Sequence, residues 1–247
     1  RINTHKTMMD INSDMGEYPE FLANGLYANL MDYVISINLA CGGHAGEEDM
    51  MAETTRIAKT KGVNVGAHPG YPDRENFGRV DLEMNAGELL ATIRDQIQLL
   101  ADITEGQGLD LSHVKAHGAL YNRAAQDRAV ARTIGAAVLQ VNPHLPVMGL
   151  SGSVMLDVFT EMGLTVLGEA FADRTYETDG SLRNRKFPDA LITDPAQAAK
   201  QAKLIAKGKI IAVDGSELEI EAQTICIHSD TPHALAIAGE VRMAMNK

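Results

Sequence analysis

The sequence predicts an α/β fold in which strands and helices alternate along one domain. Short β-branched segments are each followed by a polar or glycine-rich turn and then by a longer amphipathic segment. The chain has 247 residues, a length at which a (β/α) barrel forms a single unit. Such repeats build a parallel sheet, either as a closed barrel of irregular form or as an open doubly wound sheet, and periodicity does not separate the two. We expect one barrel domain over 8–247, and a tag remnant or disordered N-terminus over 1–7.

Eight segments have the composition of strands, and most are followed by a segment with helical periodicity. The expected strands are 8–14, 33–40, 63–67, 113–116, 146–150, 165–171, 209–213 and 224–228. The expected helices are 47–61, 85–105, 124–141, 154–162, 195–207 and 232–245. Helix 85–105 has the clearest pattern, because Leu89, Ile93, Ile97 and Leu100 recur three or four residues apart. The segments 209–213 and 224–228 would be a seventh and an eighth strand.

Composition excludes several classes of function. The chain has 33 Asp and Glu against 22 Lys and Arg, a net charge of −11, whereas nucleic-acid binding needs a clustered basic face. We therefore expect no nucleic-acid partner. We expect no membrane partner either, because no apolar run approaches the roughly 18 residues of a membrane span. The two cysteines, Cys41 and Cys226, cannot form a disulfide framework, so we expect a reducing cytoplasmic environment. The usual P-loop motif for nucleoside triphosphates is missing.

Unusual polar residues gather where the expected strands end. Asp10, Asn12 and Asp14 alternate along the first strand, so their side chains share one face. The polar residues at or after the ends of the other strands are Asn38, His44, His68, Lys115, His117, Ser151, Glu169, Asp173, Arg174, His228 and Asp230. In a parallel barrel these ends form one face, and active sites are built there. The pattern thus predicts a shared catalytic cavity.

Each of these features also has a simpler structural explanation. The alternating acids of the first strand would suit the solvated face of an edge strand, and a single histidine after a strand is more often an ordinary loop residue. Four histidines in equivalent glycine-rich turns favour function; they are His44, His68, His117 and His228. The remaining four are interpreted as structural or surface groups; they are His5, His113, His144 and His233. Lys115 lies between apolar neighbours, so we expect it to be buried against an acid or an anionic ligand. A nucleophilic Cys41 is less favoured than a small buried one.

Eight sequence blocks together resemble the LamB/YcsF family over nearly the whole chain. In order they are DINSDMGE, NLACGGHAG, GVNVGAHPGYPD, FGR, HVKAHGALYN, GLSGS, EAFADRTYETDG and TICIHSDTPHA. The resemblance implies an irregular seven-stranded (β/α) barrel of the glycoside hydrolase/deacetylase type. It also implies a subunit of an ATP-dependent 5-oxoprolinase, which hydrolyses 5-oxo-L-proline or a related lactam to L-glutamate. The expected partners are the B and C subunits, and ATP is the co-substrate of the complex.

The resemblance also assigns expected roles to residues of these blocks. The expected catalytic residues are Asp10, Asn12, Asp14, His44, His68, Lys115 and His117. The expected substrate-binding residues are Glu17, Asn38, Asp73, Arg79, Tyr121, Ser151, Glu169, Asp173, Arg174, His228 and Asp230. Asp10 or Asp14 would be the general base for water, and the histidines would be acid–base or oxyanion partners. Lys115 and Arg79 would hold the substrate carboxylate or a phosphate.

Two alternatives to this function remain open. The first is a metal-dependent deacetylase or amidohydrolase in which Asp14, His44 and His68 hold a divalent ion. No HxxxH or HExxH spacing supports a ligand pair on one helix, so the sequence leaves the metal undecided. The second is a non-catalytic subunit that binds the lactam for its partners. The sequence decides neither the precise lactam or amide, nor the ATP-binding subunit, nor the oligomeric state.

Overall fold

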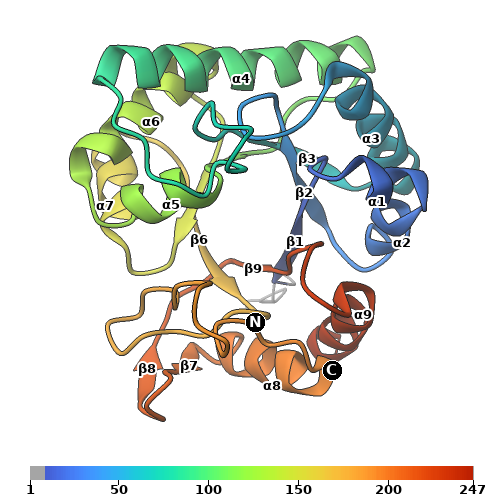
Figure 1. Cartoon of the computed structure of the whole chain (residues 1–247), viewed down its shortest axis with the longest axis vertical. Helices are drawn as coiled ribbons and strands as arrows, with labels where there is room; N and C mark the ends of the chain where they lie inside the picture. Colours follow the sequence, from blue (N-terminus) through green and yellow to red (C-terminus); the bar gives the residue numbers. More distant parts are fainter. Residues whose placement is uncertain (1–8, 247) are drawn as a thin grey trace, which may run out of the picture.

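A closed barrel of seven parallel strands forms the centre of the molecule (Figure 1). The computed structural model describes residues 9–246, so the expectation for 1–7 lies outside it. The barrel strands in order are β1 (Asp10–Met15), β2 (Ser36–Ala40), β3 (Asn64–His68), β4 (Val114–Lys115), β5 (Val147–Leu150), β6 (Val166–Phe171) and β9 (Thr224–Cys226). Strand β1 pairs with both β2 and β9, and this closure excludes the open doubly wound sheet.

Helices surround the barrel (Figure 1). They are α1 (Pro19–Ala23), α2 (Leu26–Leu30), α3 (Glu48–Lys61), α4 (Ala86–Gly106), α5 (Gly118–Ala124), α6 (Arg128–Val141), α7 (Val154–Glu161), α8 (Pro195–Ile205) and α9 (Ala234–Met245). The expected helix 85–105 is confirmed as α4, which begins where the Asn85 side chain accepts a hydrogen bond from the Glu88 amide. None of the helices that the structure describes is long and apolar enough to cross a bilayer.

The single helix expected over 124–141 is wrong at its start. Helix α6 begins at Arg128, because the Asp127 side chain accepts hydrogen bonds from the amides of Ala129 and Val130 and caps this helix. A separate short helix, α5, ends at Ala124. The short helices α1 and α2 were not expected. With five residues each, they are too short to show helical periodicity in the sequence.

The expected seventh barrel strand over 209–213 is also wrong. Strand β7 (Lys209–Ile211) pairs antiparallel with β8 (Glu217–Glu219) and forms a two-stranded sheet outside the barrel. Strand β6 pairs directly with β9, so no barrel position remains between them. The barrel therefore has seven strands, as the family resemblance implied, and the segment 224–228 supplies the closing one.

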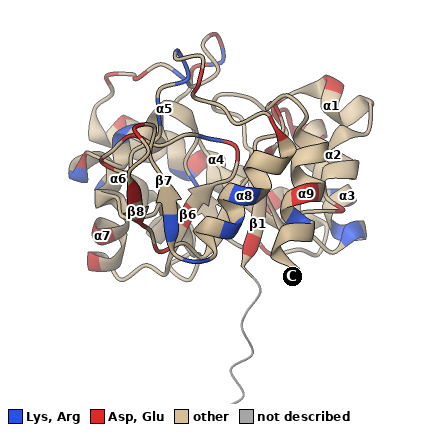
Figure 2. Cartoon of the chain, turned by 90° about the horizontal axis from the view of Figure 1, so that it is seen from below, with Lys and Arg blue, Asp and Glu red and all other residues tan. Residues whose placement is uncertain are grey.

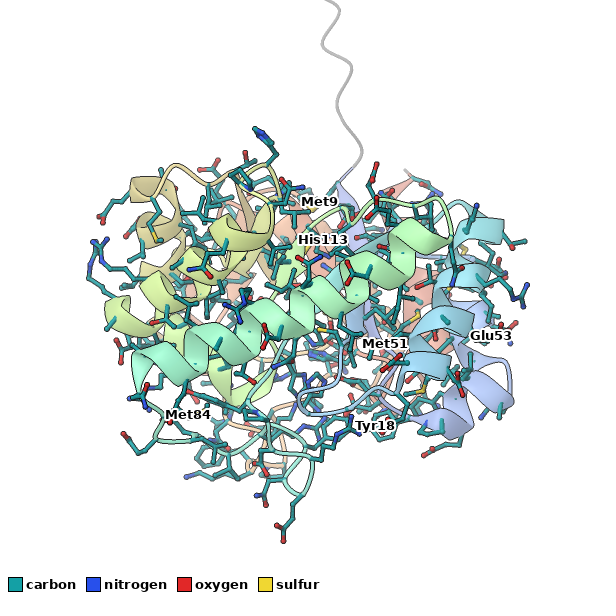
Figure 3. The ribbon with its side chains drawn as sticks, turned by 90° about the horizontal axis from the view of Figure 1, so that it is seen from above. Met9, Tyr18, Met51, Glu53, Met84 and His113 are labelled. Atoms are coloured by element: carbon teal, nitrogen blue, oxygen red, sulfur yellow. The ribbon has the colours of Figure 1, made fainter. Side chains whose placement is uncertain are left out.

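The two ends of the barrel differ in character. Figure 2 shows long loops at the end opposite the start of β1, with acidic and basic residues interspersed over the visible helices and loops. In Figure 3, His113 and Met9 lie at the end where β1 starts, whereas Tyr18 lies at the opposite end. The side chains that follow the carboxyl ends of the strands thus face the loop-rich end, where a parallel barrel builds its active site.

Candidate active site

A cavity of about 730 Å³ lies at the carboxyl ends of the barrel strands. Most of the residues that the sequence singled out line it, although they come from distant parts of the chain. They are Asp14, Glu17, His68, Arg79, Lys115, His117, Tyr121, Ser151, Arg174, His228 and Asp230. The expectation of a shared cavity at one end of a barrel is therefore confirmed for these residues.

Other predicted residues lie outside the cavity lining. They are Asp10, Asn12, Asn38, His44, Asp73, Glu169 and Asp173. Asp10 is four residues before Asp14 on one strand, a separation of about 13 Å along the barrel. Its carboxylate accepts hydrogen bonds from the hydroxyls of Ser36 and Thr224, and burial raises the pKa of Asp10. The interpretation of Asp10 as the general base is corrected by this position, because Asp10 lies below the cavity floor.

Asp73 has a local role. Its carboxylate accepts hydrogen bonds from the backbone amide and side-chain amide of Asn76, both at 3.1 Å. Its backbone carbonyl accepts from the Gly78 amide at 2.8 Å. Asp73 therefore shapes the loop that carries Phe77 and Arg79 to the cavity, and the structure does not place it where a substrate would lie.

A hydrogen-bonded layer of polar side chains forms the floor of the cavity. The Asn38 amide donates to Asn12 Oδ1 and to Asp14 Oδ1, each at 2.7 Å. His113 Nε2 donates to Asn38 Oδ1 at 2.7 Å, and the Ser112 hydroxyl donates to His113 Nδ1 at 2.8 Å. This layer fixes the orientation of Asp14 from below. The structural interpretation of His113 agrees with its place, and burial lowers the pKa of His113 to about 3.

Lys115 lines the cavity and is buried, with 2% of its surface exposed. Its Nζ lies 2.9 Å from Asp14 Oδ1, 2.9 Å from Glu169 Oε1 and 3.2 Å from Cys226 Sγ. The expectation of a buried lysine paired with an acid is confirmed. Because two carboxylates already offset its charge, Lys115 orients Asp14 rather than serving as a free anchor for a substrate carboxylate. Sequence reasoning missed Cys226, which lies two residues before His228.

Electrostatics keep this group of charges ionised. Burial alone would lower the pKa of Lys115, but Asp14, Cys226 and Glu169 together outweigh burial and raise that pKa well above its usual range. Burial would raise the pKa of Asp14, yet the Lys115 ammonium and His68 hold it well below its usual range. Glu169 also accepts hydrogen bonds from the Tyr121 hydroxyl at 2.8 Å and from the Asn12 amide at 3.1 Å. Asp14 is therefore a fixed negative charge and a weak base.

An aspartate–histidine pair lies on the β9 side of the cavity. Asp173 accepts hydrogen bonds from His228 Nδ1 at 3.1 Å, from the His228 amide at 2.8 Å and from the Thr231 hydroxyl at 2.7 Å. His228 Nε2 lies 3.7 Å from Asp14 Oδ2. Because Nδ1 donates to Asp173, the neutral imidazole presents the lone pair of Nε2 to the cavity. This is the arrangement of an oriented general base.

A second cluster consists of Glu17 and three histidines. His44 Nε2 lies 3.0 Å from Glu17 Oε1, His117 Nδ1 lies 3.2 Å from the same oxygen, and His68 Nε2 lies 3.9 Å from it. The rings of His44 and His117 are stacked, with centroids 3.5 Å apart. Burial would raise the pKa of Glu17, but the neighbouring imidazoles of His117 and His44 lower it. Burial lowers the pKa of His44 to about 3.

The structure brings the expected metal ligands only partly together. His68 Nε2 lies 3.5 Å from Asp14 Oδ2, whereas His44 Nε2 is directed to Glu17 and Asp14 Oδ1 contacts Lys115. Two other groups of buried or part-buried ligand atoms lie within 4.8 Å of one another. One is Glu17, His44, His68 and His117, and the other is Asp14, Cys226 and His228.

Arginines surround the cavity mouth. Arg79 pairs with Asp230 at 2.6 Å, and Arg185 approaches the same oxygen at 3.3 Å. Arg174 donates to the backbone carbonyl of Arg183 at 2.7 Å, and burial, followed by the charge of Arg185, lowers the pKa of Arg174 to about 10. Arg183 and Arg185 also line the cavity and were not predicted. The sequence LRNR was their only signal, and it indicates no strand end.

Two further sequence interpretations concern Ser151 and Cys41. The Ser151 hydroxyl donates to the backbone carbonyl of Glu221, so this residue ties the β5 loop to the segment before β9 at the cavity wall. Cys41 is fully buried, and burial raises the pKa of its thiol to about 12. Since the thiolate is the nucleophile, Cys41 is a structural residue, as the favoured interpretation held.

Comparison with known proteins places the chain in a family. The model of the LamB/YcsF family matches residues 9–247. The chain belongs to the LamB/YcsF family. It is 46% identical over 235 residues to the A subunit of 5-oxoprolinase from Chloroflexus aggregans, a match that covers 95% of this chain and 93% of that one. It is 41% identical to the protein of the same name from Haemophilus influenzae, over 97% and 96% of the two chains.

Two solved structures with the same fold resemble this LamB/YcsF protein. The lactam utilization protein of Thermus thermophilus has a TM-score of 0.89 and 42% identity, with 96% of each chain covered. A putative cellobiose-phosphate cleavage protein from Enterococcus faecalis has a TM-score of 0.55 and 12% identity, over 96% of this chain and 93% of that one. The second likeness shows the fold alone. Together they support the irregular barrel that the family resemblance implied.

Proposed function

We propose that this chain is the A subunit of a 5-oxoprolinase and contains the site where the lactam is hydrolysed. The observation that carries the proposal is the full-length similarity to proteins of that name, combined with a cavity whose groups suit an anionic cyclic amide. The substrate is 5-oxo-L-proline, the products are L-glutamate and the hydrolysis products of ATP, and the B and C subunits complete the enzyme. ATP is a co-substrate of that complex.

Recognition of the substrate carboxylate falls to the arginines at the mouth. Arg174 is buried and turns its guanidinium toward backbone carbonyls at the cavity wall, while Arg79 and Arg185 share Asp230. A guanidinium matches a carboxylate with two parallel hydrogen bonds. The chain as a whole is acidic, so this local concentration of arginine is the feature that attracts an anionic substrate.

His228 is the general base of the proposed reaction. It takes a proton from water through Nε2, while Asp173 holds Nδ1 and stabilises the imidazolium that forms. The Asp14 carboxylate, 3.7 Å from Nε2, orients that water with its Oδ2. This assignment replaces Asp14 as base, because the paired Lys115 makes the Asp14 carboxylate weakly basic.

The balance of the reaction is simple. The oxygen of water bonds to the lactam carbonyl carbon, the ring carbon–nitrogen bond breaks, and the nitrogen receives a proton to become the amine of glutamate. Transfer of the γ-phosphoryl group of ATP to the amide oxygen, with release of ADP, would make that carbon electrophilic. Water addition and cleavage of the ring carbon–nitrogen bond would then leave an acyl phosphate of glutamate, which a second water molecule would hydrolyse to glutamate and inorganic phosphate. Lys115 and Tyr121 line the cavity. The Lys115 ammonium is paired with Asp14 and Glu169, and the Tyr121 hydroxyl donates to Glu169, so both groups act by holding these carboxylates in place.

The test is an assay of the assembled enzyme. We expect glutamate formation from 5-oxoproline, with ATP, only when this chain is mixed with the B and C subunits. Turnover in His228→Asn and in Asp173→Asn should fall by roughly 10²- to 10⁴-fold, as for the loss of a general base or its orienting partner. His144→Asn, an exposed histidine, is the matched control. Turnover of both site variants within about tenfold of the parent, a difference of roughly 1.4 kcal/mol, would remove His228 from the role of base.

A further inference from the structure

Two imidazole rings of the histidine cluster point nitrogen atoms at each other. His68 Nε2 and His117 Nδ1 are 3.1 Å apart. The opposite nitrogen of each ring faces a backbone carbonyl: His68 Nδ1 lies 2.8 Å from the carbonyl oxygen of Lys115, and His117 Nε2 lies 2.9 Å from that of Phe77. A carbonyl oxygen only accepts hydrogen bonds, so both outer nitrogens carry the hydrogen.

If both rings are neutral, their inner nitrogens present lone pairs to each other, and His68 Nε2 also lies 3.5 Å from Asp14 Oδ2. Glu17 Oε1 adds a third electron-rich atom, 3.2 Å from His117 Nδ1 and 3.9 Å from His68 Nε2. His44 places no hydrogen between the His68 and His117 nitrogens, because its Nε2 is 3.0 Å from Glu17 Oε1 and donates to that oxygen. Three such atoms at these distances repel unless positive charge lies between them.

We propose that Glu17, His68 and His117 bind a divalent transition-metal ion such as Zn²⁺. Two atoms bound tetrahedrally to one zinc ion, each about 2.0–2.1 Å from it, lie roughly 3.3 Å apart. Two of the three separations here are close to that value, at 3.1 and 3.2 Å, and the third, between Glu17 Oε1 and His68 Nε2, is wider at 3.9 Å. All three residues line the cavity, whereas His44 does not. Three protein ligands with a fourth position open to the cavity are typical of a catalytic rather than a structural metal site.

The surroundings hold these three side chains in place. Backbone carbonyls fix the tautomers of both histidines, the outer-shell arrangement that metal-bound histidines show. Phe77 supplies one of these carbonyls from a left-handed backbone conformation with φ of 57°, a strained geometry of the kind found at functional sites. A Cβ on Gly78 would come within 2.7 Å of His44 Cβ, so the loop packs directly on the stacked rings. The Tyr27 hydroxyl accepts from the Glu17 amide at 3.0 Å.

The inference goes beyond the proposed function and does not rest on it. A metal site in this cavity would be compatible with lactam hydrolysis and with other amide hydrolyses. A proton shared between His68 and His117 is the competing explanation of their approach, because one protonated ring would also remove the repulsion. Burial opposes protonation of His68, but the Asp14 carboxylate favours it and the pKa of His68 is raised. The experiment must therefore detect the metal itself and not only activity.

The test uses the full chain, stripped with a chelator, dialysed and titrated with Co²⁺ and then with Zn²⁺. We expect one Co²⁺ per chain, with the visible absorption of tetrahedral cobalt bound by nitrogen and oxygen, and displacement of that absorption by Zn²⁺. His68→Gln and Glu17→Gln should weaken Co²⁺ binding by at least about tenfold. His144→Gln, at an exposed histidine, should bind as the parent does.

Folding of each variant is checked by circular dichroism and by its thermal transition without metal. Zn²⁺ should raise the transition temperature of the parent and of His144→Gln, and should raise it less in the two ligand variants, because a ligand that binds the folded state stabilises it. Should a glutamine variant fail to fold, His117→Asn provides the same measurement. Absence of stoichiometric Co²⁺ binding by the folded parent, or binding unchanged in the ligand variants, would overturn the proposal and favour the shared proton. The turnover assay of the assembled enzyme with His228→Asn is independent of this result.

Discussion

Replacing His113 by glutamine should make the stability of the protein less sensitive to mild acid. His113 is buried below the cavity, donates Nε2–H to Asn38, and accepts at Nδ1 from the Ser112 hydroxyl. It is neutral in the folded protein, because burial lowers its pKa to about 3. Glutamine keeps one amide donor for Asn38 and does not titrate.

The size of the effect follows from the difference between the folded and unfolded pKa. In the unfolded chain the histidine has a pKa of about 6.5, so below that pH the unfolded state binds more protons than the folded state. The stability contribution of neutral His113 is complete above pH about 6.5 and is lost as the pH falls toward about 3. Between pH 7.5 and 5.5, His113 alone should lower the free energy of unfolding by about 1.4 kcal/mol, which His113→Gln should not lose.

The assay is urea unfolding of the parent and of His113→Gln at pH 7.5 and pH 5.5. The glutamine variant will be less stable than the parent at pH 7.5, because the ring volume is lost, but the two pH dependences should differ by the amount given above. His144→Gln changes an exposed histidine and should leave the pH dependence of the parent unchanged. Equal pH dependence in the parent and His113→Gln would show that folded His113 takes up a proton near pH 6.5, contrary to its burial and hydrogen bonds.

Three further substitutions test the packing of the site by urea unfolding. Lys115→Met leaves the buried carboxylates of Asp14 and Glu169 without their cation and should lower the free energy of unfolding by about 3–5 kcal/mol. Adding Glu169→Gln should restore part of this loss. No restoration would show that the charges of Lys115 and Glu169 are not coupled. Gly43→Ala would bring a Cβ within 2.3 Å of Gln96 Oε1 and should lower the free energy of unfolding by about 1–3 kcal/mol. Unchanged stability would mean that the Gln96 side chain moves away without loss. Tyr27→Phe removes the hydroxyl that accepts hydrogen bonds from the backbone amides of Glu17 and Tyr18, and should lower the free energy of unfolding by about 1–3 kcal/mol. An unchanged free energy of unfolding would mean that water replaces the hydroxyl.

The repeat of strands and helices could be predicted because each element has a local signal. Helix α4 shows four apolar residues at helical spacing, and β1 shows alternating polar residues whose shared face became the barrel interior. The seven-strand closure had no local signal. The segment 209–213 is as β-branched as a barrel strand, and only the direct pairing of β6 with β9 excludes it from the barrel. Register between distant strands is a tertiary property, so composition alone did not show it.

In the candidate site too, some features could be predicted from local sequence signals and others depend on contacts between distant residues. The position of a residue at a strand end predicted its presence in the cavity for His68, Lys115 and His228. The partners of these residues could not be predicted. Asp173 binds His228, which is 55 residues away in the sequence, and Lys115 pairs with Glu169 of another strand. The role of each residue in the site depends on its partner. We therefore propose Lys115 as an orienting group, and His228 in place of the aspartates as the base.

The polar interior of the barrel is best explained by the demands of the cavity above it. An apolar filling would stabilise a barrel of this size at least as well, because buried ion pairs often contribute less than the hydrophobic groups that could replace them. Here the buried layers form a continuous chain of hydrogen bonds from Thr224 through Asn12 and Asn38 to Asp14. These hydrogen bonds restrict the Asp14 carboxylate, whose oxygens lie 2.9 Å from Lys115 Nζ and 3.7 Å from His228 Nε2. Such preorganisation lowers the cost of orienting charges during reaction, and stability alone would not require it.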